Sequence, residues 1–395
     1  MDAKITEAVV EALNSGWITT GPRTKLFEKK LTEFNGNKAT LCVNSASGGL
    51  ELMLKWFGIG AGDEVILPAY TYAATANVII HTGATPVFVD SNSDFNISAR
   101  HIEAAITKNT KAIMPVDLGG WPCDYDSINQ IVNKEEIKRL FQPTNEQQQK
   151  LGRILVLSDA AHSLGAIYKG RPTGSLTDIT VFSFHAVKNL TTAEGGAIAL
   201  NLPEPFDNEE VYKYLNIKSL HGQSKDALAK TQIGNWRYDI LEAGYKYNMT
   251  DIQAAMGLVE LERYKDDMLV RRKQIFDRYS MIFGEDKRFL IPEYQNQEST
   301  SSYHVYLLRI NEINEKQRDE IIRLIFEQQV TVNVHFIPLP MMTFYKSIGY
   351  KIENYPICYK NYSCEISLPV YYTLSNEQVD QVANAVIHAV DTILK

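Results

Sequence analysis

The apolar positions between about residues 40 and 200 fall into short runs that longer amphipathic stretches separate. Runs that are almost continuously apolar predict strands buried on both faces, as in a parallel sheet covered by helices. Their alternation with helix-like stretches such as 71–83 favours a mainly parallel α/β sheet. The predicted strands are EVILPAY (64–70), TPVFVD (85–90), AIMPVDL (112–118), RILVLSD (153–159), ITVFSF (179–184) and GAIAL (196–200).

Helical spacing dominates both ends of the chain. Ile5, Val9, Val10 and Leu13 are spaced as on one face of an amphipathic N-terminal helix. A second helical pattern begins near Thr250 and is long enough to leave the first domain. Beyond it, a smaller α/β set is predicted, with strands at 302–310 and 332–336 and helices around 315–329 and 376–394.

These patterns predict two domains. We expect a large domain over residues 1–265 and a smaller C-terminal α/β domain over residues 266–395. Residues 130–152 are polar and helix-prone, which indicates a surface insertion before a core strand of the large domain.

Composition and charge narrow the function classes. With 45% hydrophobic and 22% charged residues among 395, the chain has an ordinary globular composition. A net charge of −7 argues against nucleic acid as a partner, because such proteins usually carry a basic patch. Nowhere do about 18 apolar residues run without a charge, so we expect no transmembrane helix and no membrane partner.

The cysteines and the N-terminus bear on location. Cys42, Cys123, Cys358 and Cys364 include no C-x2-C pair, so we predict reduced thiols in a cytoplasmic protein, and no metal site. The N-terminal sequence carries acidic residues and has no uninterrupted apolar core, unlike a signal peptide.

Asp159 closes the predicted strand 153–159, and ligands of open α/β sheets bind beyond such strand ends. A carboxylate there could coordinate a metal, act as a general base, or pair with the pyridinium nitrogen of a cofactor. His162 follows in the same string, SDAAHSLGA (158–166). The alternative is that Asp159 only caps a helix.

Lys188 follows the predicted strand 179–184 and precedes a Gly-Gly pair that opens the next one. Partial burial at such a position lowers the pKa of a lysine and frees its amine to attack an aldehyde. Together with Asp159, Lys188 matches the needs of pyridoxal phosphate (PLP), which requires an imine-forming lysine and an acidic partner for the ring nitrogen.

Two further strings could contact such a cofactor. Small residues at 45–49 open a helix, whose N–H groups and hydroxyls could bind a phosphate, although taken alone they more commonly mark an ordinary Ser-capped helix. Tyr72 could stack on a flat ring or simply pack in the core. GIGAG (58–62) precedes a strand, so we interpret it as a turn and not a dinucleotide fingerprint.

Taken together, these strings resemble the DegT/StrS family of PLP-dependent nucleotide-sugar aminotransferases. The resemblance covers nearly the whole chain. It rests on GWITTGP (16–22), SDAAHSLGA (158–166), FSFHAVKN (182–189), AEGG (193–196) and GYKYNMTDIQAA (244–255).

The resemblance implies a type I PLP fold like that of aspartate aminotransferase, and a homodimer with active sites at the subunit interface. It makes Lys188 the Schiff-base lysine and proton shuttle, and Asp159 the partner of the pyridinium nitrogen. It places His162 beside the cofactor ring and its phenolic oxygen. The further residues that it assigns are Ala46, Ser47 and Ser183 at the phosphate, Tyr72 on the ring, Lys246 and Asn248 at the cofactor, and His185 and His335 at the substrate.

Some positions depart from the family pattern. Lys246 stands where many members have an Asn that reaches a phosphate in the neighbouring subunit, and a cation suits that place chemically. Asp117 and Pro340 each replace a histidine that is common in the family. We expect these two positions near the sugar, where they would bear on substrate identity.

The implied activity is transfer of an amino group from glutamate to a nucleotide-linked keto-deoxy sugar by a ping-pong scheme. One alternative is a PLP-dependent sugar dehydratase on the same fold, but those relatives carry histidine in place of Lys188. The other is a non-catalytic regulatory protein. No helix-turn-helix pattern or basic stripe supports direct DNA binding by such a protein, and a pure binding role would leave the pairing of Asp159 and Lys188 without a purpose.

Overall fold

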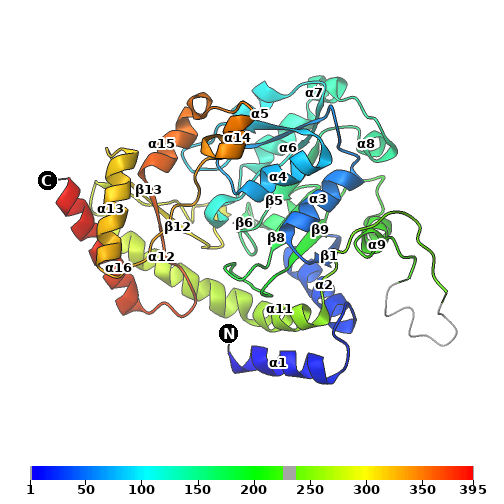
Figure 1. Ribbon diagram of the computed structural model, residues 1–395, viewed down its shortest axis with the longest axis horizontal. Coiled ribbons are helices and arrows are strands. Elements are labelled where there is room, and N and C mark those ends of the chain that lie inside the picture. Colours follow the sequence, from blue (N-terminus) through cyan, green and yellow to red (C-terminus); the bar gives the residue numbers. More distant parts are fainter. Residues whose placement is uncertain (1, 226–236, 395) are drawn as a thin grey trace.

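A mainly parallel sheet forms the centre of the fold (Figure 1). The computed structural model describes residues 2–225 and 237–394 of the chain. In that part, seven strands form one sheet in the order β1-β9-β8-β5-β4-β2-β3, and β9 alone runs antiparallel to its neighbours. The strands are β1 (Ala39–Val43), β2 (Glu64–Pro68), β3 (Thr85–Val89), β4 (Thr110–Ile113), β5 (Leu155–Asp159), β8 (Ile179–Ser183) and β9 (Gly196–Leu200).

Helices cover both faces of this sheet, as the continuously apolar strands predict. On one face, strand residues such as Val43 and Ile198 belong to the same apolar cluster as Leu50 of α3. On the other face, alternate residues such as Phe182 pack with Phe27 of α2. The helices of this part are α1 (Ala3–Asn14), α2 (Pro22–Asn35), α3 (Ala46–Trp56), α4 (Ala73–Thr82), α5 (Ala99–Ala105), α6 (Tyr125–Asn133), α7 (Glu135–Leu140), α8 (Glu146–Leu151), α9 (Asn208–Lys218) and α11 (Asp251–Arg263).

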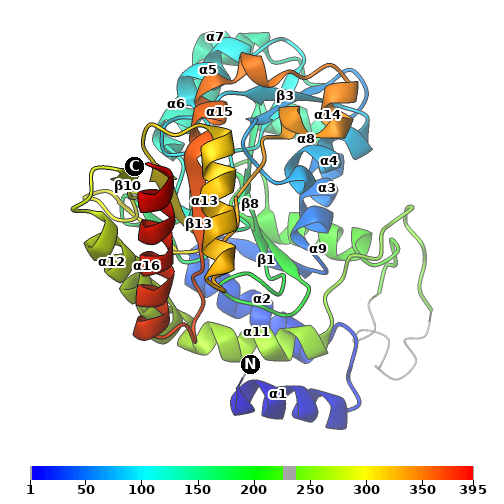
Figure 2. The same ribbon diagram turned by 60° about the vertical axis from the view of Figure 1, so that its left-hand side comes forward.

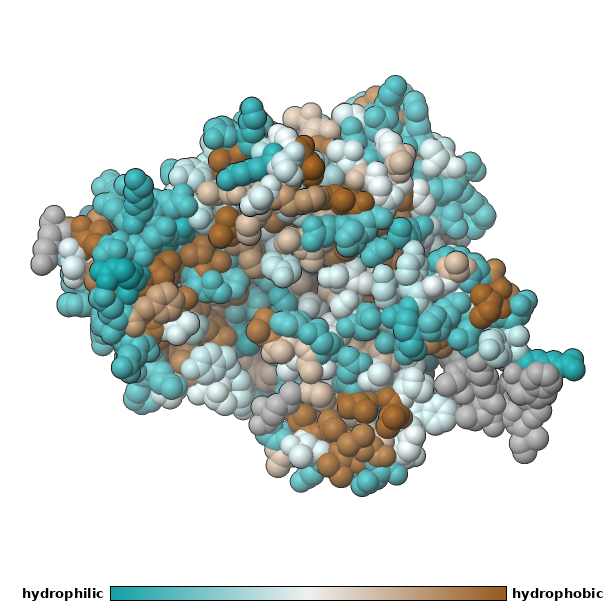
Figure 3. All heavy atoms as spheres, viewed as in Figure 1, coloured by the Kyte–Doolittle hydropathy of each residue, from teal (hydrophilic) through white to brown (hydrophobic). Residues whose placement is uncertain are grey.

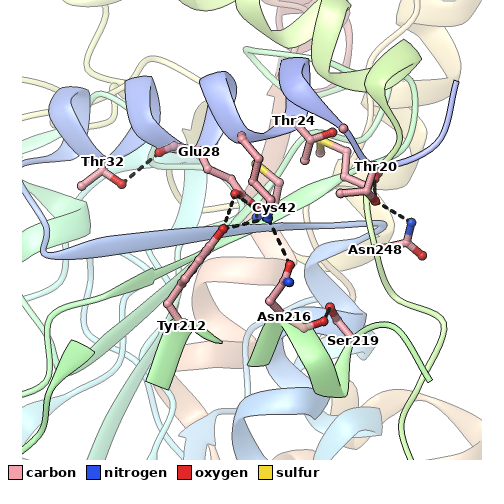
Figure 4. A network of polar contacts seen from close by, with 12 residues as sticks. Thr20, Thr24, Glu28, Thr32, Cys42, Tyr212, Asn216, Ser219 and Asn248 are labelled. Atoms are coloured by element: carbon pink, nitrogen blue, oxygen red, sulfur yellow. Dashed lines mark hydrogen bonds and ion pairs between the residues drawn. The ribbon is translucent and has the colours of Figure 1, made fainter. Parts of the chain in front are cut away.

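A buried polar network fixes the edge strand β1 between α2 and α9 (Figure 4). Glu28 accepts hydrogen bonds from the Cys42 N–H at 3.0 Å and from the Tyr212 hydroxyl at 2.7 Å. Burial raises the pKa of the Glu28 carboxyl, and Lys25, 3.2 Å away, lowers it. Because β1 leads directly into α3, this network also holds the start of that helix.

One long helical path leads from the large sheet to the C-terminal part, as the pattern from Thr250 predicts. Thr250 and Gln253 form a capping box that begins α11. A π-helical turn, Tyr264–Met268, then joins α11 to α12 (Leu269–Phe283). Figure 2 shows α12 leaving the large sheet and lying beside α16.

In the C-terminal part of the described chain, a three-stranded antiparallel sheet has the order β10-β12-β13. Its residues form an apolar cluster of their own with α12, α13 and α16. A second small sheet combines β11 with β6 and β7. The elements are β6 (Ile167–Tyr168), β7 (Arg171–Pro172), β10 (Phe289–Leu290), β11 (Ser299–Thr300), β12 (Tyr306–Ile310), β13 (Glu365–Leu368), α13 (Glu315–Glu327), α14 (Thr343–Ser347), α15 (Pro356–Cys364) and α16 (Asn376–Ile393).

The structure differs from the sequence prediction in several places. β1 was not predicted, because Thr40 and Cys42 interrupt its short apolar run. The strand predicted at 332–336 is wrong, since only Asn333 forms an isolated bridge, to Ser367. The polar stretch 130–152 forms the end of α6 with α7 and α8, and its Ile137 is buried in the core of the large sheet.

Candidate active site

A cavity of about 380 Å³ opens at the carboxyl ends of β5 and β8, beside the start of α3. Ligands bind at this edge in open α/β sheets. Most of the predicted site residues line the cavity, although they come from segments far apart in the sequence. They are Ala46, Ser47, Tyr72, Asp159, His162, Ser183, His185, Lys188 and His335.

Asp159 ends β5 with its side chain buried. Its carboxylate accepts hydrogen bonds from the Thr75 hydroxyl at 2.8 Å and from the Ala161 N–H at 3.3 Å. Burial raises the pKa of Asp159, while Thr75, the Ala161 N–H and Lys188 lower it. The helix-cap alternative for Asp159 is wrong, because the residues after it form turns and no helix begins there.

Lys188 lies in the loop between β8 and β9, where its N–H donates to the His185 carbonyl at 2.9 Å. Burial lowers the pKa of Lys188 to about 8, and Asp159 acts in the opposite direction. An amine with this pKa is far more often neutral near physiological pH than an exposed lysine is, so it can attack a carbonyl carbon.

The ring of His162 is held in one tautomer. Its Nδ1 accepts a hydrogen bond from the Gly119 N–H at 3.3 Å, so the neutral ring carries its proton on Nε2. Burial, together with the charge of Lys188, keeps the pKa of His162 well below its usual range. His162 is therefore a neutral hydrogen-bond donor at the cavity wall.

The His304 ring packs against that of His162, tilted by 37° with a ring-centroid distance of 4.3 Å. The amide nitrogen of Asn189 donates to the Ser302 carbonyl, which leaves its oxygen to accept from His304 Nδ1 at 2.8 Å. His304 is buried, and burial keeps its pKa well below the usual range. The two histidines form a neutral wall next to Lys188.

The start of α3 supplies the other end of the cavity. Ser45 is the N-cap, and its hydroxyl accepts from the Gly48 N–H at 3.0 Å. Ala46 and Ser47 follow in the first turn, whose N–H groups the helix itself does not use. Gly196 of β9 passes directly beneath, where a Cβ would lie 2.6 Å from the Ala46 nitrogen. Backbone N–H groups and hydroxyls arranged in this way bind phosphate.

Two predicted cofactor residues do not line this cavity. The Asn248 side chain points to Thr20 and donates to its hydroxyl at 2.7 Å (Figure 4). Lys246 is exposed, and its carbonyl accepts from the Asn44 side chain. Within a single chain, neither side chain belongs to the cavity that holds Lys188 and Asp159.

Asp117 does not lie at the cavity, and the expectation that it faces the sugar is wrong. It is fully buried and accepts hydrogen bonds from Ser163 at 2.6 Å, from Tyr125 at 2.7 Å and from the Cys123 N–H at 2.9 Å. These contacts tie the turn after β4 to the turn that carries His162. Asp117 therefore supports the site from behind.

Sequence reasoning missed several residues that line or support the cavity, among them His304, Phe336 and Thr75. Thr75 lies one helical turn after Thr71, and their hydroxyls are 2.8 Å apart, a spacing that could have drawn attention to both. His304 and Phe336 come from the C-terminal part of the chain. No local pattern reports that they return to the large sheet.

Neither a metal centre nor a bilayer-spanning helix is found in the part of the chain that the structure describes. In residues 2–225 and 237–394, no three side chains of His, Cys, Asp or Glu are grouped so that they could hold a metal ion. Among the helices in these ranges, none combines the length and apolar character needed to span a bilayer.

Comparison with known proteins agrees with this geometry. The model of the DegT/DnrJ/EryC1/StrS aminotransferase family matches residues 1–142 and 145–387. The spore coat polysaccharide biosynthesis protein SpsC of Bacillus subtilis is 39% identical over 385 residues, which cover 96% of this chain and 92% of SpsC.

Solved structures are similar over the whole length. The PLP form of Spr1654 from Streptococcus pneumoniae, named as a sugar aminotransferase, is 43% identical with a TM-score of 0.94 and covers 100% of this chain and 98% of its own. PseC of Helicobacter pylori, an aminotransferase involved in the biosynthesis of pseudoaminic acid, is 28% identical with a TM-score of 0.86. That match covers 99% of this chain and 97% of PseC.

The fold and the cavity define an aminotransferase of fold type I with PLP as its cofactor. The cavity residues fit PLP. A buried carboxylate, a helix start with hydroxyls and a lysine of lowered pKa all line the same cavity. The chain belongs to the DegT/DnrJ/EryC1/StrS aminotransferase family.

Proposed function

We propose that this aminotransferase moves an amino group from glutamate to a nucleotide-linked keto-deoxy sugar. The observation that carries the proposal is the meeting of Lys188, Asp159 and the α3 start in one cavity, with His185 and His335 on its rim. The sugar substrate is supported by the relatives, whose names connect them with sugar transamination and polysaccharide biosynthesis.

Each residue has a stated task in this proposal. When bound, PLP supplies a ring that accepts the electron pair left by removal of a proton from the donor carbon. The Lys188 Nζ removes that proton, and its pKa of about 8 suits it to proton transfer near neutral pH. Asp159 would stay ionised beside a cationic ring nitrogen, because that charge would offset the effect of burial. The His162 Nε2–H would donate to the phenolic oxygen of the cofactor.

Ser47, Ser183 and the first N–H groups of α3 would hold the phosphate, and Tyr72 would cover the ring. Tyr72 is 62% exposed in the single chain, so its face is available for stacking. The buried rings of His162 and His304 exclude water from the opposite wall. His185 and His335 would contact the sugar, where their ring nitrogens can bind hydroxyl groups.

We further propose a homodimer in which Lys246 of each chain reaches the phosphate end of the other chain's cavity. Lys246 is exposed, and among the described lysines and arginines only Lys188 lines the cavity of its own chain. An apolar surface at α1 supports the proposal. Val10 and Leu13 are 47% and 51% exposed there, and this part of the molecule is visibly hydrophobic in Figure 3.

The test combines glutamate with a panel of UDP-, dTDP- and GDP-linked keto-sugars. Wild-type protein loaded with PLP should form 2-oxoglutarate, and mass spectrometry should then show an amino sugar from one member of the panel. Lys188→Ala should lower kcat at least about 100-fold, because the proton-transfer group is gone. Lys150→Ala, on the surface helix α8, is the control and should behave as wild type.

Two outcomes would contradict the proposal. If Lys188→Ala transaminates at the wild-type rate, the assignment of the lysine is wrong. If the wild type reacts with glutamate but accepts no sugar of the panel, the nucleotide-linked substrate is wrong.

A further inference from the structure

The segment Asn333–Phe336 leaves the small sheet and runs over the cavity. At its start, the Asn333 N–H donates to the Ser367 carbonyl at 3.1 Å, and the Ser367 N–H donates back at 2.7 Å. A regular antiparallel ladder would continue at the His335 N–H. That N–H instead donates to the Glu365 carboxylate at 3.2 Å and to the Ser367 hydroxyl at 3.1 Å. Two side chains of β13 thus replace the ladder where the chain turns toward the cavity.

Glu365 is fully buried, although a carboxyl group is costly to bury. Among the described residues, the Ser367 hydroxyl also donates to this carboxyl group, at 2.5 Å. No ion pair involves Glu365 in the described chain, and Arg318 donates to its backbone carbonyl. Burial raises the pKa of Glu365 to about 8, while Ser367, Arg318 and the His335 N–H lower it. The hydrogen bonds of this carboxyl group therefore hold the backbone of the Asn333–Phe336 segment in place.

The far side of the segment is anchored to the large sheet. The Leu339 N–H donates to the Ala69 carbonyl at 3.1 Å, just before Tyr72. Between the two anchors, the Phe336 ring lies 5.6 Å from that of Tyr72 and 5.9 Å from that of His162. His335 and Phe336 both line the cavity. A shift of the Glu365 anchor would therefore move side chains on the substrate side of the site.

We propose that Glu365, assisted by Ser367, is a positioning residue that holds His335 and Phe336 in place to receive the sugar. The proposal rests on the function proposed above, because His335 is placed at the sugar there. Glu365 does not touch the substrate. It acts through the backbone of His335, at the point where the chain passes from the small sheet to the large one.

Four variants separate this role from general damage. Glu365→Ala removes the carboxyl, and Ser367→Ala removes only the hydroxyl. Glu365→Gln keeps an oxygen that can accept from the His335 N–H and an amide that can donate to Ser367. Asp380→Asn is the control, because it removes a salt bridge to Arg278 in the same domain without contact to the segment.

In Glu365→Ala, the KM for the keto-sugar should rise roughly 10- to 100-fold, as expected when binding groups are displaced by about an ångström. Ser367→Ala should show a smaller rise. Glu365→Gln should restore KM to within about threefold of wild type, because the hydrogen bond to the His335 N–H is kept. The glutamate half-reaction and the visible absorbance of bound PLP should stay close to wild type in every variant, because Lys188 and Asp159 are not displaced.

A second measurement does not depend on activity. Hydrogen exchange of the peptide covering residues 333–338 should be faster in Glu365→Ala than in wild type or Asp380→Asn, since its anchoring bond is lost. Unchanged exchange in a folded Glu365→Ala protein would overturn the proposal. So would an equal loss in the glutamate half-reaction, or a Glu365→Gln variant as defective as Glu365→Ala. If Glu365→Ala does not fold, Ser367→Ala carries the same comparison.

Failure of the proposed function gives a different result. Wild-type protein would then aminate no sugar, whereas the exchange comparison would still show whether Glu365 anchors the segment.

Discussion

Burial acts on the two central residues in opposite directions. It raises the pKa of the Asp159 carboxyl and lowers that of the Lys188 amine, so each group is shifted toward its neutral form. Both shifts favour the cofactor chemistry. A neutral amine can bond to the PLP aldehyde, and a carboxylate with few partners gains most from a cationic ring nitrogen.

Asp159→Asn should make the protein without PLP more stable near neutral pH. Because the folded-state pKa of Asp159 is raised, its stabilising contribution is present at acidic pH and is lost as the pH rises through that pKa. The variant has no charge to bury, so its melting temperature should exceed that of wild type at pH 7, with the two curves converging under acidic conditions. Calorimetry across this pH range measures the difference.

The same substitution should lower kcat at least about 100-fold, because the ring nitrogen loses its charged partner. PLP should therefore raise the melting temperature of wild type more than that of the variant. Asp178→Asn is not a suitable control, because the salt bridge between Asp178 and Arg153 is itself buried. Asp126→Asn removes an exposed salt bridge to Lys169 and should change neither quantity. A less stable Asp159→Asn protein without PLP would count against this account.

Single site residues could be predicted where a reactive side chain falls at or just after the end of a predicted strand. Asp159 ends one strand and Lys188 follows another. Strand ends of a parallel sheet share one edge, so the proximity of these two residues could be inferred. Asp117 was misplaced because sequence position alone does not show which face of a turn a side chain takes. His304 was missed because its ring contact with His162 joins residues more than a hundred positions apart.

At the scale of elements, the turn Leu118–Gly120 connects the cofactor side of the site to the C-terminal part of the chain. The Gly119 N–H holds His162, and the Gly120 carbonyl accepts from the Ser302 N–H at 3.1 Å. The Ser302 hydroxyl in turn donates to the His162 carbonyl at 2.5 Å. His162 is thus fixed by its ring and by its backbone.

Gly120→Ala should damage this turn in two ways. Gly120 has a φ of 92°, and an added Cβ would lie 2.2 Å from the Ser302 hydroxyl oxygen and 3.1 Å from the His162 carbonyl oxygen. Backbone strain should lower the free energy of unfolding by about 1–3 kcal/mol, and the clash should add a similar amount. Affinity for PLP should fall as well, because His162 moves.

Gly62→Ala is a matched control for strain alone. Gly62 has a φ of 91° with no atom within 4 Å of an added Cβ. Urea unfolding and PLP titration of both variants measure the difference between them. Equal losses of stability with unchanged PLP affinity would show that the contacts of Gly120 with Ser302 and His162 have no role.

The strands of the large sheet were predictable because burial on both faces leaves a continuous apolar run, as in ITVFS of β8. The segment 332–336 has similar apolar letters but is not a strand. Its His335 N–H bonds to side chains and its Phe336 turns into the cavity. A local pattern reports the apolar character of a segment and does not distinguish a sheet partner from a cavity wall.

At the scale of the whole molecule, the chain crosses between the two apolar cores more than once. It leaves the large sheet along α11 and α12. It returns between α13 and β13, since Tyr345 and Tyr355 belong to the core of the large sheet. The domain division near residue 265 remains a prediction of the sequence. The returning segment brings His335 and Phe336 to the cavity, so the proposed sugar side depends on how the two cores are held together.

The proposed dimer makes a specific prediction about mixed subunits. Two differently tagged chains, one Lys188→Ala and the other Lys246→Ala, are co-expressed and the hybrid is purified through both tags. If Lys246 serves the neighbouring chain, one of the two sites in the hybrid has both lysines, and the hybrid should show about half of the wild-type activity. Each homodimer should be far less active, because every site in it lacks one of the two lysines.

If Lys246 serves its own chain, no site in the hybrid is intact, and its activity would only equal the mean of the two homodimers. A chain that purifies with one tag only would contradict the dimer itself.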